Sequence, residues 1–201
     1  MYLYGLLYDV AIETLIRSAR RHMLTLVRTY GITRVLDLCC GTGSFCRRLY
    51  DEGGTVCGLD LEKGLMRYAV RRHSGPHYLC ADAVHPPVAD NTFSAAVFSY
   101  ALHDKNPDQR SAMLSAAHRI VKPDGHLLLL DFEQPWSARS RIGRVMTALI
   151  EKMAGREHEH NGLEFLKSGG LRAMIEREGL VERERILVEY GHSAVVLACW
   201  P

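Results

Sequence analysis

The segment from Val35 to Phe45, which reads VLDLCCGTGSF, constrains the fold of this chain more than any other segment. An apolar run ends around Asp37, and two glycines, Gly41 and Gly43, follow within a few residues. Glycine adopts backbone angles that other residues avoid, and it lets the backbone come close to a ligand. A helix is expected to begin near Ser44. The segment therefore predicts a buried strand, a tight turn and a helix in succession.

Short apolar runs alternate with helical patterns over much of the remaining chain. A first amphipathic helix, with apolar residues at three- and four-residue steps and its arginines largely on a solvated face, should end at Gly31. Asn106 and Pro107 form an N-cap and first turn for a later helix, and KPDG at 122–125 should turn that helix into a strand. The expected strands before residue 135 are 34–38, 55–59, 77–80, 95–99 and 126–130. Such alternation is typical of a parallel sheet with crossover helices.

Two further strand-like runs, 185–190 and 194–200, close the chain. The three residues between them are too few for a parallel crossover, so we expect these strands to pair antiparallel. The predicted fold class is therefore α/β, with a Rossmann-like, doubly wound, seven-stranded sheet that is mostly parallel and has an antiparallel last strand.

Composition excludes several classes of protein. The chain has 201 residues, of which 47% are hydrophobic and 24% are charged, as in ordinary soluble globular proteins. A formal net charge of +2 is too small for a nucleic-acid-binding surface, so no nucleic-acid partner is expected. The apolar runs are too short for a transmembrane segment, and no basic segment introduces the N-terminus as in a signal peptide. We expect a cytoplasmic protein, with peripheral membrane contact through its arginines left open.

The cysteines and histidines do not form a metal-binding pattern. The six cysteines lack CxxC spacing, which favours reduced and buried thiols. Cys39 and Cys40 are expected to be adjacent strand residues that point to opposite faces and serve packing. His158 and His160 are two residues apart and so lie on different faces of a helix, with no third ligand identifiable. No metal site is predicted.

Three acidic residues, Asp37, Asp60 and Asp82, lie at or just after the ends of successive predicted strands. Asp60 ends the second strand about 20 residues after the glycine turn, where an acidic side chain can bind ribose hydroxyls. Asp82 follows the third strand. A dinucleotide is disfavoured, because its GxGxxG fingerprint requires a glycine where this chain has Cys46, and because Asp37 would repel a pyrophosphate. A carboxylate at the glycine turn suits instead a cationic ligand such as an aminoacyl ammonium.

Four ordered motifs resemble those of class I S-adenosylmethionine-dependent methyltransferases: VLDLCCGTG, LDLEKGLMRYA from Leu59, ADA at 81–83 and VKPDG at 121–125. The resemblance implies S-adenosylmethionine as cofactor and S-adenosylhomocysteine as product. It implies that Asp37 meets the ammonium, Asp60 the ribose and Asp82 the adenine. The implied cofactor-binding residues are Asp37, Leu38, Cys39, Gly41, Thr42, Gly43, Asp60, Leu61, Asp82, Ala83, Ser99 and Tyr100.

A narrower resemblance is to the ubiquinone and menaquinone biosynthesis C-methyltransferases, through DLCCGTG, SYALHDKNP at 99–107 and LDFEQP at 130–135. It implies methyl transfer to a small or lipophilic acceptor, either quinone-like or another small molecule. The chain lacks the long insertion that those enzymes usually carry after the fifth strand, which argues against a large isoprenoid quinone. The expected organisation is one domain over residues 1–201, with a capping helix over 1–31 and a helical insert over 135–170 that shapes the acceptor site.

Tyr100, His103 and Asp104 are the candidate catalytic residues, because they follow the fourth strand at the edge where open α/β sheets bind ligands. An imidazole can take a proton from a phenol, an enol or a thiol, although many methyl transfers need only alignment of the reactants. His103 as a helix cap or a cofactor contact remains open beside its role as a base. A non-catalytic S-adenosylmethionine-binding module that regulates a partner is the alternative function, because its glycine turn and acids would look the same.

Overall fold

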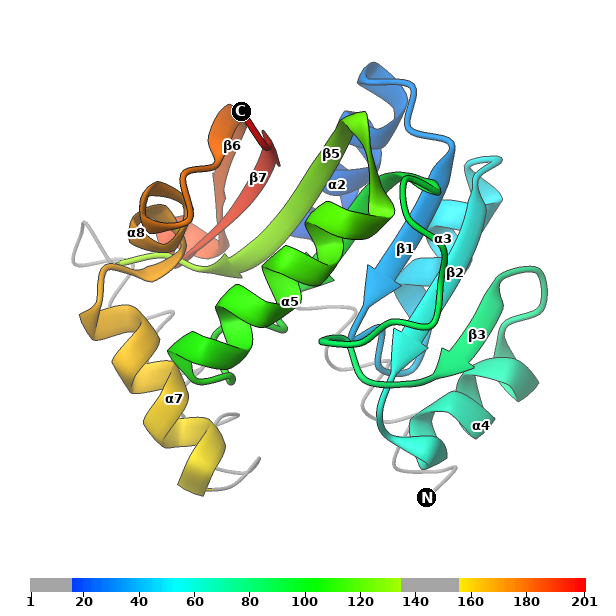
Figure 1. Ribbon diagram of the computed structural model, residues 1–201, viewed down its shortest axis with the longest axis horizontal. Helices are drawn as coiled ribbons and strands as arrows, with labels where there is room; N and C mark the ends of the chain where they lie inside the picture. The colour runs from blue at the N-terminus through cyan, green and yellow to red at the C-terminus, as the bar shows by residue number, and fades with distance from the viewer. Residues whose placement is uncertain (1–15, 135–155) are drawn as a thin grey trace.

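The computed structural model describes residues 16–134 and 156–201, which form a twisted sheet with helices on both faces (Figure 1). The strands are β1 (Arg34–Leu38), β2 (Thr55–Asp60), β3 (His77–Cys80), β4 (Phe93–Ser99), β5 (Val121–Phe132), β6 (Val181–Val188) and β7 (Ser193–Cys199). The helices are α2 (Arg17–Thr29), α3 (Ser44–Asp51), α4 (Lys63–Arg72), α5 (Pro107–Ile120), α7 (Arg156–Lys167) and α8 (Gly170–Arg177), with a short 3-10 turn η1 (Glu189–Gly191). Residues 1–15 of the expected capping segment and 135–155 of the expected insert lie outside the described part.

The seven strands lie in the order β3-β2-β1-β4-β5-β7-β6. The strands β1 to β5 pair parallel to one another, whereas β7 pairs antiparallel with both β5 and β6. Because β7 reverses between them, β6 again runs in the direction of β1 to β5. The predicted fold class and the antiparallel pairing of the last two strands are confirmed, and the carboxyl ends of β1 to β6 share one edge of the sheet.

Two hydrophobic cores hold the helices to the sheet. On one face, α5 and α8 pack on residues such as Leu127 and Leu129, and on the other face α2 and α3 pack on Leu128 and Leu130. All four leucines of this run are fully buried, because side chains of successive strand residues point to opposite faces and both faces are covered. The uninterrupted apolar run was thus a correct signal of a central strand.

Two helix ends show how local sequence sets the boundaries. The α2 helix ends in a Schellman motif around Gly31, whose φ is +61°, with the Ile32 amide donating to the Val27 carbonyl at 2.9 Å. The α5 helix starts with a capping box, in which the Gln109 amide donates to the Asn106 side chain and the Asn106 amide donates to the Gln109 side chain. Both ends agree with the predictions from sequence.

Several strand boundaries differ from the predictions, and the starts of β5 and β6 differ most. The β6 strand begins at Val181, before the expected residue 185, because its alternating charged residues lie exposed on an edge strand with no apolar run to mark it. KPDG does not connect α5 to the strand, because Val121 already pairs with Phe93 directly after the helix. The pairing then resumes at His126 opposite Ala95, so residues 122–125 bulge out of the strand.

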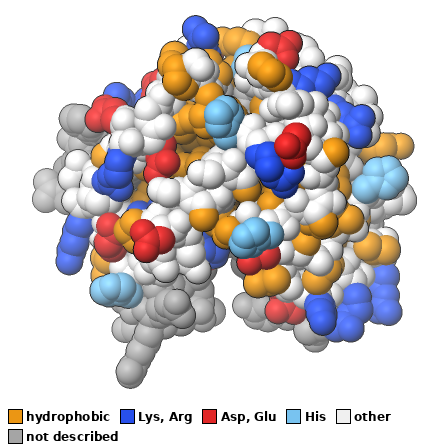
Figure 2. All heavy atoms as spheres, in the orientation of Figure 1, with side chains coloured by type: hydrophobic (Ala, Val, Ile, Leu, Met, Phe, Trp, Pro, Cys, Tyr) orange, Lys and Arg blue, Asp and Glu red, His pale blue; other side chains and the backbone are white. Residues whose placement is uncertain are grey.

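On the face shown in Figure 2, lysine and arginine side chains are interspersed with acidic and apolar ones. Among the helices in the described ranges, none combines the length and the apolar character required to cross a membrane.

Candidate cofactor and acceptor sites

The turn after β1 is hydrogen-bonded to the end of β2. The Gly41 amide donates to Asp60 Oδ2 at 2.9 Å, and the Cys40 amide donates to the Leu59 carbonyl at 3.0 Å. The other Asp60 oxygen, Oδ1, accepts the Glu62 amide at 2.9 Å. The structure thus brings together the glycine turn and the second predicted acid at the shared carboxyl edge. Each carboxylate oxygen has two acceptor positions, so Asp60 retains capacity for further donors.

The two glycines of the turn serve different purposes. Both have a left-handed φ, +58° for Gly41 and +75° for Gly43, which other residues adopt only with strain. A Cβ at Gly43 would lie 2.7 Å from the Tyr78 side chain, so packing against β3 requires this glycine. A Cβ at Gly41 would meet no atom of residues 16–134 or 156–201 within 4 Å. Of the two, Gly41 therefore faces the space that a ligand can enter.

Asp37 is a buried carboxylate with incomplete hydrogen bonding. Asp37 is only 2% exposed, and its Oδ2 accepts a hydrogen bond from the Cys46 thiol at 3.2 Å. The other oxygen, Oδ1, is buried and has no hydrogen-bond partner in the part of the chain that the structure describes. Burial raises the pKa of Asp37 from 3.8 to about 6, against the opposing effects of Cys46 and Arg20. Among the described residues, therefore, no donor meets Oδ1, although the charge of Arg20 acts on this carboxyl group.

Arg20 is a residue of this site that was not predicted from the sequence. It was expected on the solvated face of the first helix, as Arg17, Arg21 and Arg28 are, but it is partly buried. Its Nη1 donates to Ser44 Oγ at 2.8 Å, and its guanidinium lies 5.3 Å from the centre of the Phe45 ring. Its charge acts on both Asp37 and Tyr100. Its position near the stripe of apolar residues on α2 was the available signal.

The other predicted cofactor residues fall into two groups. Leu61 is 69% exposed beside Asp60, and Asp82 is exposed, with Oδ1 accepting the Val84 amide at 2.9 Å. Leu38 and Ala83 are buried in the core that α5 covers, which leaves their backbone as the part available to a ligand. Thr42 is also buried, and Ser99 Oγ is buried without a hydrogen-bond partner in the described chain.

The expectation that Cys39 and Cys40 continue the strand is wrong. The β1 strand ends at Leu38, and Cys39 has a φ of +62°, an uncommon value for a residue with a side chain. The two cysteines nevertheless pack against opposite cores, as predicted. Burial raises the pKa of Cys39 to about 12, so this thiol stays protonated. Among the described residues, no group of three or more His, Cys, Asp or Glu side chains has a geometry suited to a metal ion.

His103 is joined to Asp131 at the ends of β4 and β5. His103 Nδ1 lies 2.7 Å from Asp131 Oδ1, and Asp131 Oδ2 accepts the amides of Leu102 and His103 at 3.0 Å and 3.3 Å. Burial acts to raise the pKa of Asp131, but the charge and hydrogen bond of His103, together with backbone amides, lower it overall. Asp131 therefore holds both the loop and the imidazole. Asp131 was not predicted from the sequence, although its position at the end of an apolar strand was a signal.

Tyr100 and Asp104, the other two candidate catalytic residues, have different hydrogen-bond partners near the pair of His103 and Asp131. The Tyr100 hydroxyl donates to Ser193 Oγ at 2.9 Å, and burial raises the Tyr100 pKa, so the phenol stays neutral. Its backbone φ is +53°. Asp104 accepts Lys105 Nζ at 2.7 Å, and its backbone carbonyl accepts Asn161 Nδ2 of α7 at 2.8 Å. Asp104 is thus engaged by its neighbour, which makes it a weaker candidate base than His103.

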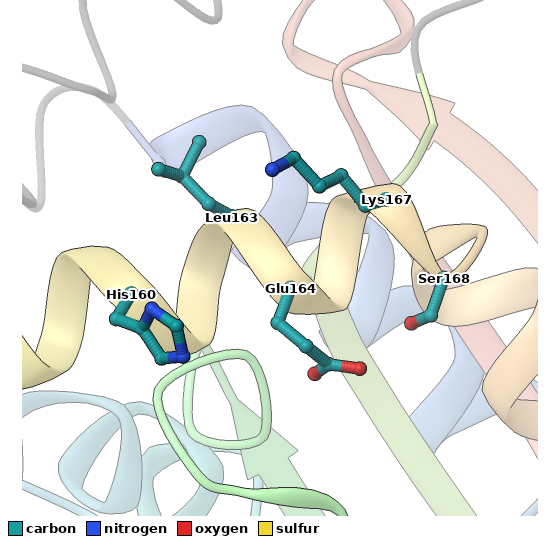
Figure 3. A pocket seen from close by; sticks show the side chains of 5 residues that line it. All are labelled: His160, Leu163, Glu164, Lys167 and Ser168. Atoms are coloured by element: carbon teal, nitrogen blue, oxygen red, sulfur yellow. The ribbon is translucent and has the colours of Figure 1, made fainter.

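A cavity of about 400 Å³ lies along α7 (Figure 3). Leu163 and Lys167 point to one side of the helix and Glu164 to the other. Glu164 accepts Arg110 Nη2 at 2.6 Å, which ties α7 to α5. The described lining residues are His160, Leu163, Glu164, Lys167 and Ser168. Together with the Asn161 contact to Asp104, this places α7 beside the loop that carries His103.

Residues 35–125 match the family model of a methyltransferase domain. This stretch of the chain is a methyltransferase domain. Over 132 residues it is 32% identical to a demethylmenaquinone methyltransferase of Renibacterium salmoninarum, a match that covers 64% of this chain and 55% of that protein. The chain therefore spans about half the length of this relative.

Solved structures share the fold of this methyltransferase domain. The PH0226 protein from Pyrococcus horikoshii OT3 has a TM-score of 0.68 at 18% identity, covering 92% of this chain and 91% of that one. The N-methyltransferase NodS from Bradyrhizobium japonicum WM9, in complex with S-adenosylhomocysteine, has a TM-score of 0.66 at 16% identity, covering 93% and 88%. The resemblance inferred from the motifs is confirmed, as is the Rossmann-like fold.

Proposed function

We propose that this protein binds S-adenosylmethionine at the carboxyl edge of β1 to β3 and transfers its methyl group to a small aromatic, quinone-like acceptor beside β4 and β5. The observation that carries the proposal is the buried Asp37 carboxylate, whose Oδ1 has no partner among the described residues, near the end of the strand that leads into the open turn at Gly41. An ammonium group placed there would supply a hydrogen bond to Oδ1 and a second positive charge beside that of Arg20.

The remaining residues at this edge fit the other parts of the cofactor. Asp60 has acceptor positions left for ribose hydroxyls, and the exposed Leu61 offers an apolar surface to the adenine. Asp82 stands at the end of the neighbouring strand, where the Ala81 amide donates to the Asp60 carbonyl at 3.1 Å. When bound, S-adenosylmethionine supplies a methyl group on a sulfonium centre and leaves as S-adenosylhomocysteine.

On the acceptor side, we assign His103 the role of proton acceptor. Asp131 fixes its Nδ1, so His103 would act through Nε2, and the paired carboxylate stabilises the imidazolium that forms. Tyr100, which stays neutral, positions rather than deprotonates the acceptor. We further propose that residues 1–201 act as one domain, with the segment 1–31 and the insert 135–170 covering the carboxyl edge. Arg20 at Ser44 and Asn161 at Asp104 support this arrangement.

Two findings support the quinone-like acceptor. The Renibacterium salmoninarum relative is named for methylation of demethylmenaquinone. Aromatic rings also gather at the end of β5, where the Phe132 ring lies 4.3 Å from the ring of His103 and 5.3 Å from that of Tyr100, measured between centroids. The proposal is tested by incubating the protein with labelled S-adenosylmethionine and reduced quinones. A non-catalytic binding module is the alternative, and it would bind the cofactor without transferring label to any acceptor.

Replacing Asp60 with alanine is expected to weaken S-adenosylhomocysteine binding by about tenfold or more, because the ribose loses a charged acceptor. The Gly41 and Glu62 amides also lose their partner, so the turn loosens. Isothermal titration calorimetry measures the affinity. Replacing the exposed Asp124 with alanine is the control. Equal affinities for the Asp60 variant and the unmodified protein would contradict the assignment of this edge as the cofactor site.

A further inference from the structure

The connection between β6 and β7 is a strained turn. Three successive residues adopt a left-handed backbone, with φ of +50° at Glu189, +59° at Tyr190 and +82° at Gly191. Glycine adopts this region freely, but the two preceding residues carry side chains and do so at a cost. Strain of this kind persists only where the surrounding structure imposes it, and it gathers at functional sites.

Contacts with the acceptor side impose this conformation. The Glu133 amide donates to the His192 carbonyl at 2.8 Å, and the His192 amide donates to the Glu189 carbonyl at 3.1 Å. The His192 ring stacks on Phe132 at 5.0 Å between centroids. Tyr100 reaches the same connection through its bond to Ser193. The turn is therefore bound to the ends of β4 and β5, where His103 and Asp131 lie.

The Glu189 side chain is the unexplained group in this turn. Its Oε1 atom is buried, and no hydrogen-bond partner for it exists among residues 16–134 and 156–201. Burial raises the pKa of this carboxyl group, and its charge acts on the nearby Tyr100. The Tyr100 hydroxyl does not satisfy it, because that hydroxyl donates to Ser193. A buried acceptor without a donor is costly, so its presence calls for a ligand.

The position of Glu189 defines which part of a ligand it can meet. The β6 strand ends at the same edge as β4 but three strands away, about 14 Å at the usual spacing of strands. The methyl group to be transferred lies, in the proposed function, at the β1 and β4 side of this edge. Glu189 is therefore placed to contact the end of an acceptor that is remote from the methylated atom.

We propose that Glu189 is a specificity-determining residue that accepts a hydrogen bond from a hydroxyl group of the aromatic methyl acceptor, at the end remote from the methylated atom. The inference rests on the proposed function, because it takes the acceptor to lie along this edge. A carboxylate held without a donor selects strongly for ligands that bring one, since ligands lacking it leave the buried oxygen unsatisfied.

The test compares two probes that differ by one hydroxyl group, naphthohydroquinone and 1-naphthol. Binding of each is measured by anaerobic calorimetry in the presence of saturating S-adenosylhomocysteine. The unmodified protein is expected to prefer naphthohydroquinone by about tenfold or more. Glu189→Leu should abolish this preference and Glu189→Gln should reduce it, because a neutral amide oxygen is a weaker acceptor. Glu176→Gln, at an exposed position on α8, is the matched control and should retain it.

Two further measurements separate the possible failures. S-adenosylhomocysteine affinity should be unchanged in both Glu189 variants, and their melting temperatures should equal or exceed that of the unmodified protein, because the negative charge at the buried Oε1 position is removed. Retained preference in Glu189→Leu, no preference in the unmodified protein, or a marked fall in melting temperature would each overturn the proposal. Failure of the unmodified protein to bind S-adenosylhomocysteine would instead refute the proposed function, and this inference with it.

Discussion

Replacing Asp37 with asparagine is expected to weaken S-adenosylmethionine binding by on the order of 100-fold, because a buried ammonium loses its opposite charge. The amide is nearly the same size as the carboxylate and still offers an oxygen to the Cys46 thiol. The glycine turn should therefore keep its shape. Isothermal titration calorimetry with S-adenosylmethionine and S-adenosylhomocysteine measures the loss, and Asp124→Asn, at an exposed position, is the control.

The same substitution should stabilise the ligand-free protein. The folded-state pKa of Asp37 is about 6, above the ordinary value of 3.8. A carboxyl group with a raised pKa costs no stability below pH 3.8, where it is protonated in both states. The cost accumulates as the pH rises from 3.8 to about 6 and stays constant above that range. At neutral pH this cost is about 3 kcal/mol, which asparagine avoids. Urea unfolding should therefore show a higher free energy of unfolding for Asp37→Asn than for the unmodified protein at pH 7.5, and no difference at pH 3.5.

The cofactor affinity of the unmodified protein should depend on the ionisation of Asp37. An ammonium binds the ionised form of Asp37, so affinity should fall as the pH drops below about 6. Asp37→Asn should lose this dependence. A variant that binds as tightly as the unmodified protein, or that shows the same pH profile, would show that the ammonium group binds elsewhere.

Replacing Asp131 with alanine is expected to lower the free energy of unfolding by about 3–5 kcal/mol. This carboxylate accepts the amides of Leu102, His103 and Phe132 in addition to the His103 ring. Truncation leaves these buried donors unpaired. The pKa of Asp131 is lowered in the folded state, so its contribution is present above the ordinary value and is lost only as the pH falls through the folded value. The deficit of the variant should therefore shrink in acid.

A milder change separates folding from catalysis. Asp131→Asn keeps the shape of the side chain but supplies an amide where the backbone donors need an acceptor, and it removes the charge that supports an imidazolium. The turnover of a reduced quinone should fall about 100-fold, while S-adenosylhomocysteine affinity stays unchanged. Urea unfolding and single-turnover assays measure the two effects. A loss below 1 kcal/mol in Asp131→Ala, with full turnover in Asp131→Asn, would contradict the role given to the pair.

The sequence by itself determined the order of elements and the location of the cofactor edge. The four leucines of β5, the capping box of α5 and Gly31 at the end of α2 are local signals, because burial on both faces, end-capping and backbone freedom depend on residues close in the chain. The glycine turn and the two acids, Asp37 and Asp60, were also recognisable from their spacing along the chain. The β6 strand was harder to place, since its exposed edge position imposes little apolar pattern.

Only the tertiary structure decided which side chains meet. His103 and Asp131 are 28 residues apart and become a pair because β4 and β5 end side by side. Arg20 is partly buried and its charge acts on Asp37 because α2 packs next to α3. Leu38 and Ala83 are buried in the core. Sequence periodicity reports one face of one element, whereas burial, charge and a missing partner are properties of several elements packed together. For this reason the buried oxygens of Asp37 and Glu189 were found only in the folded chain.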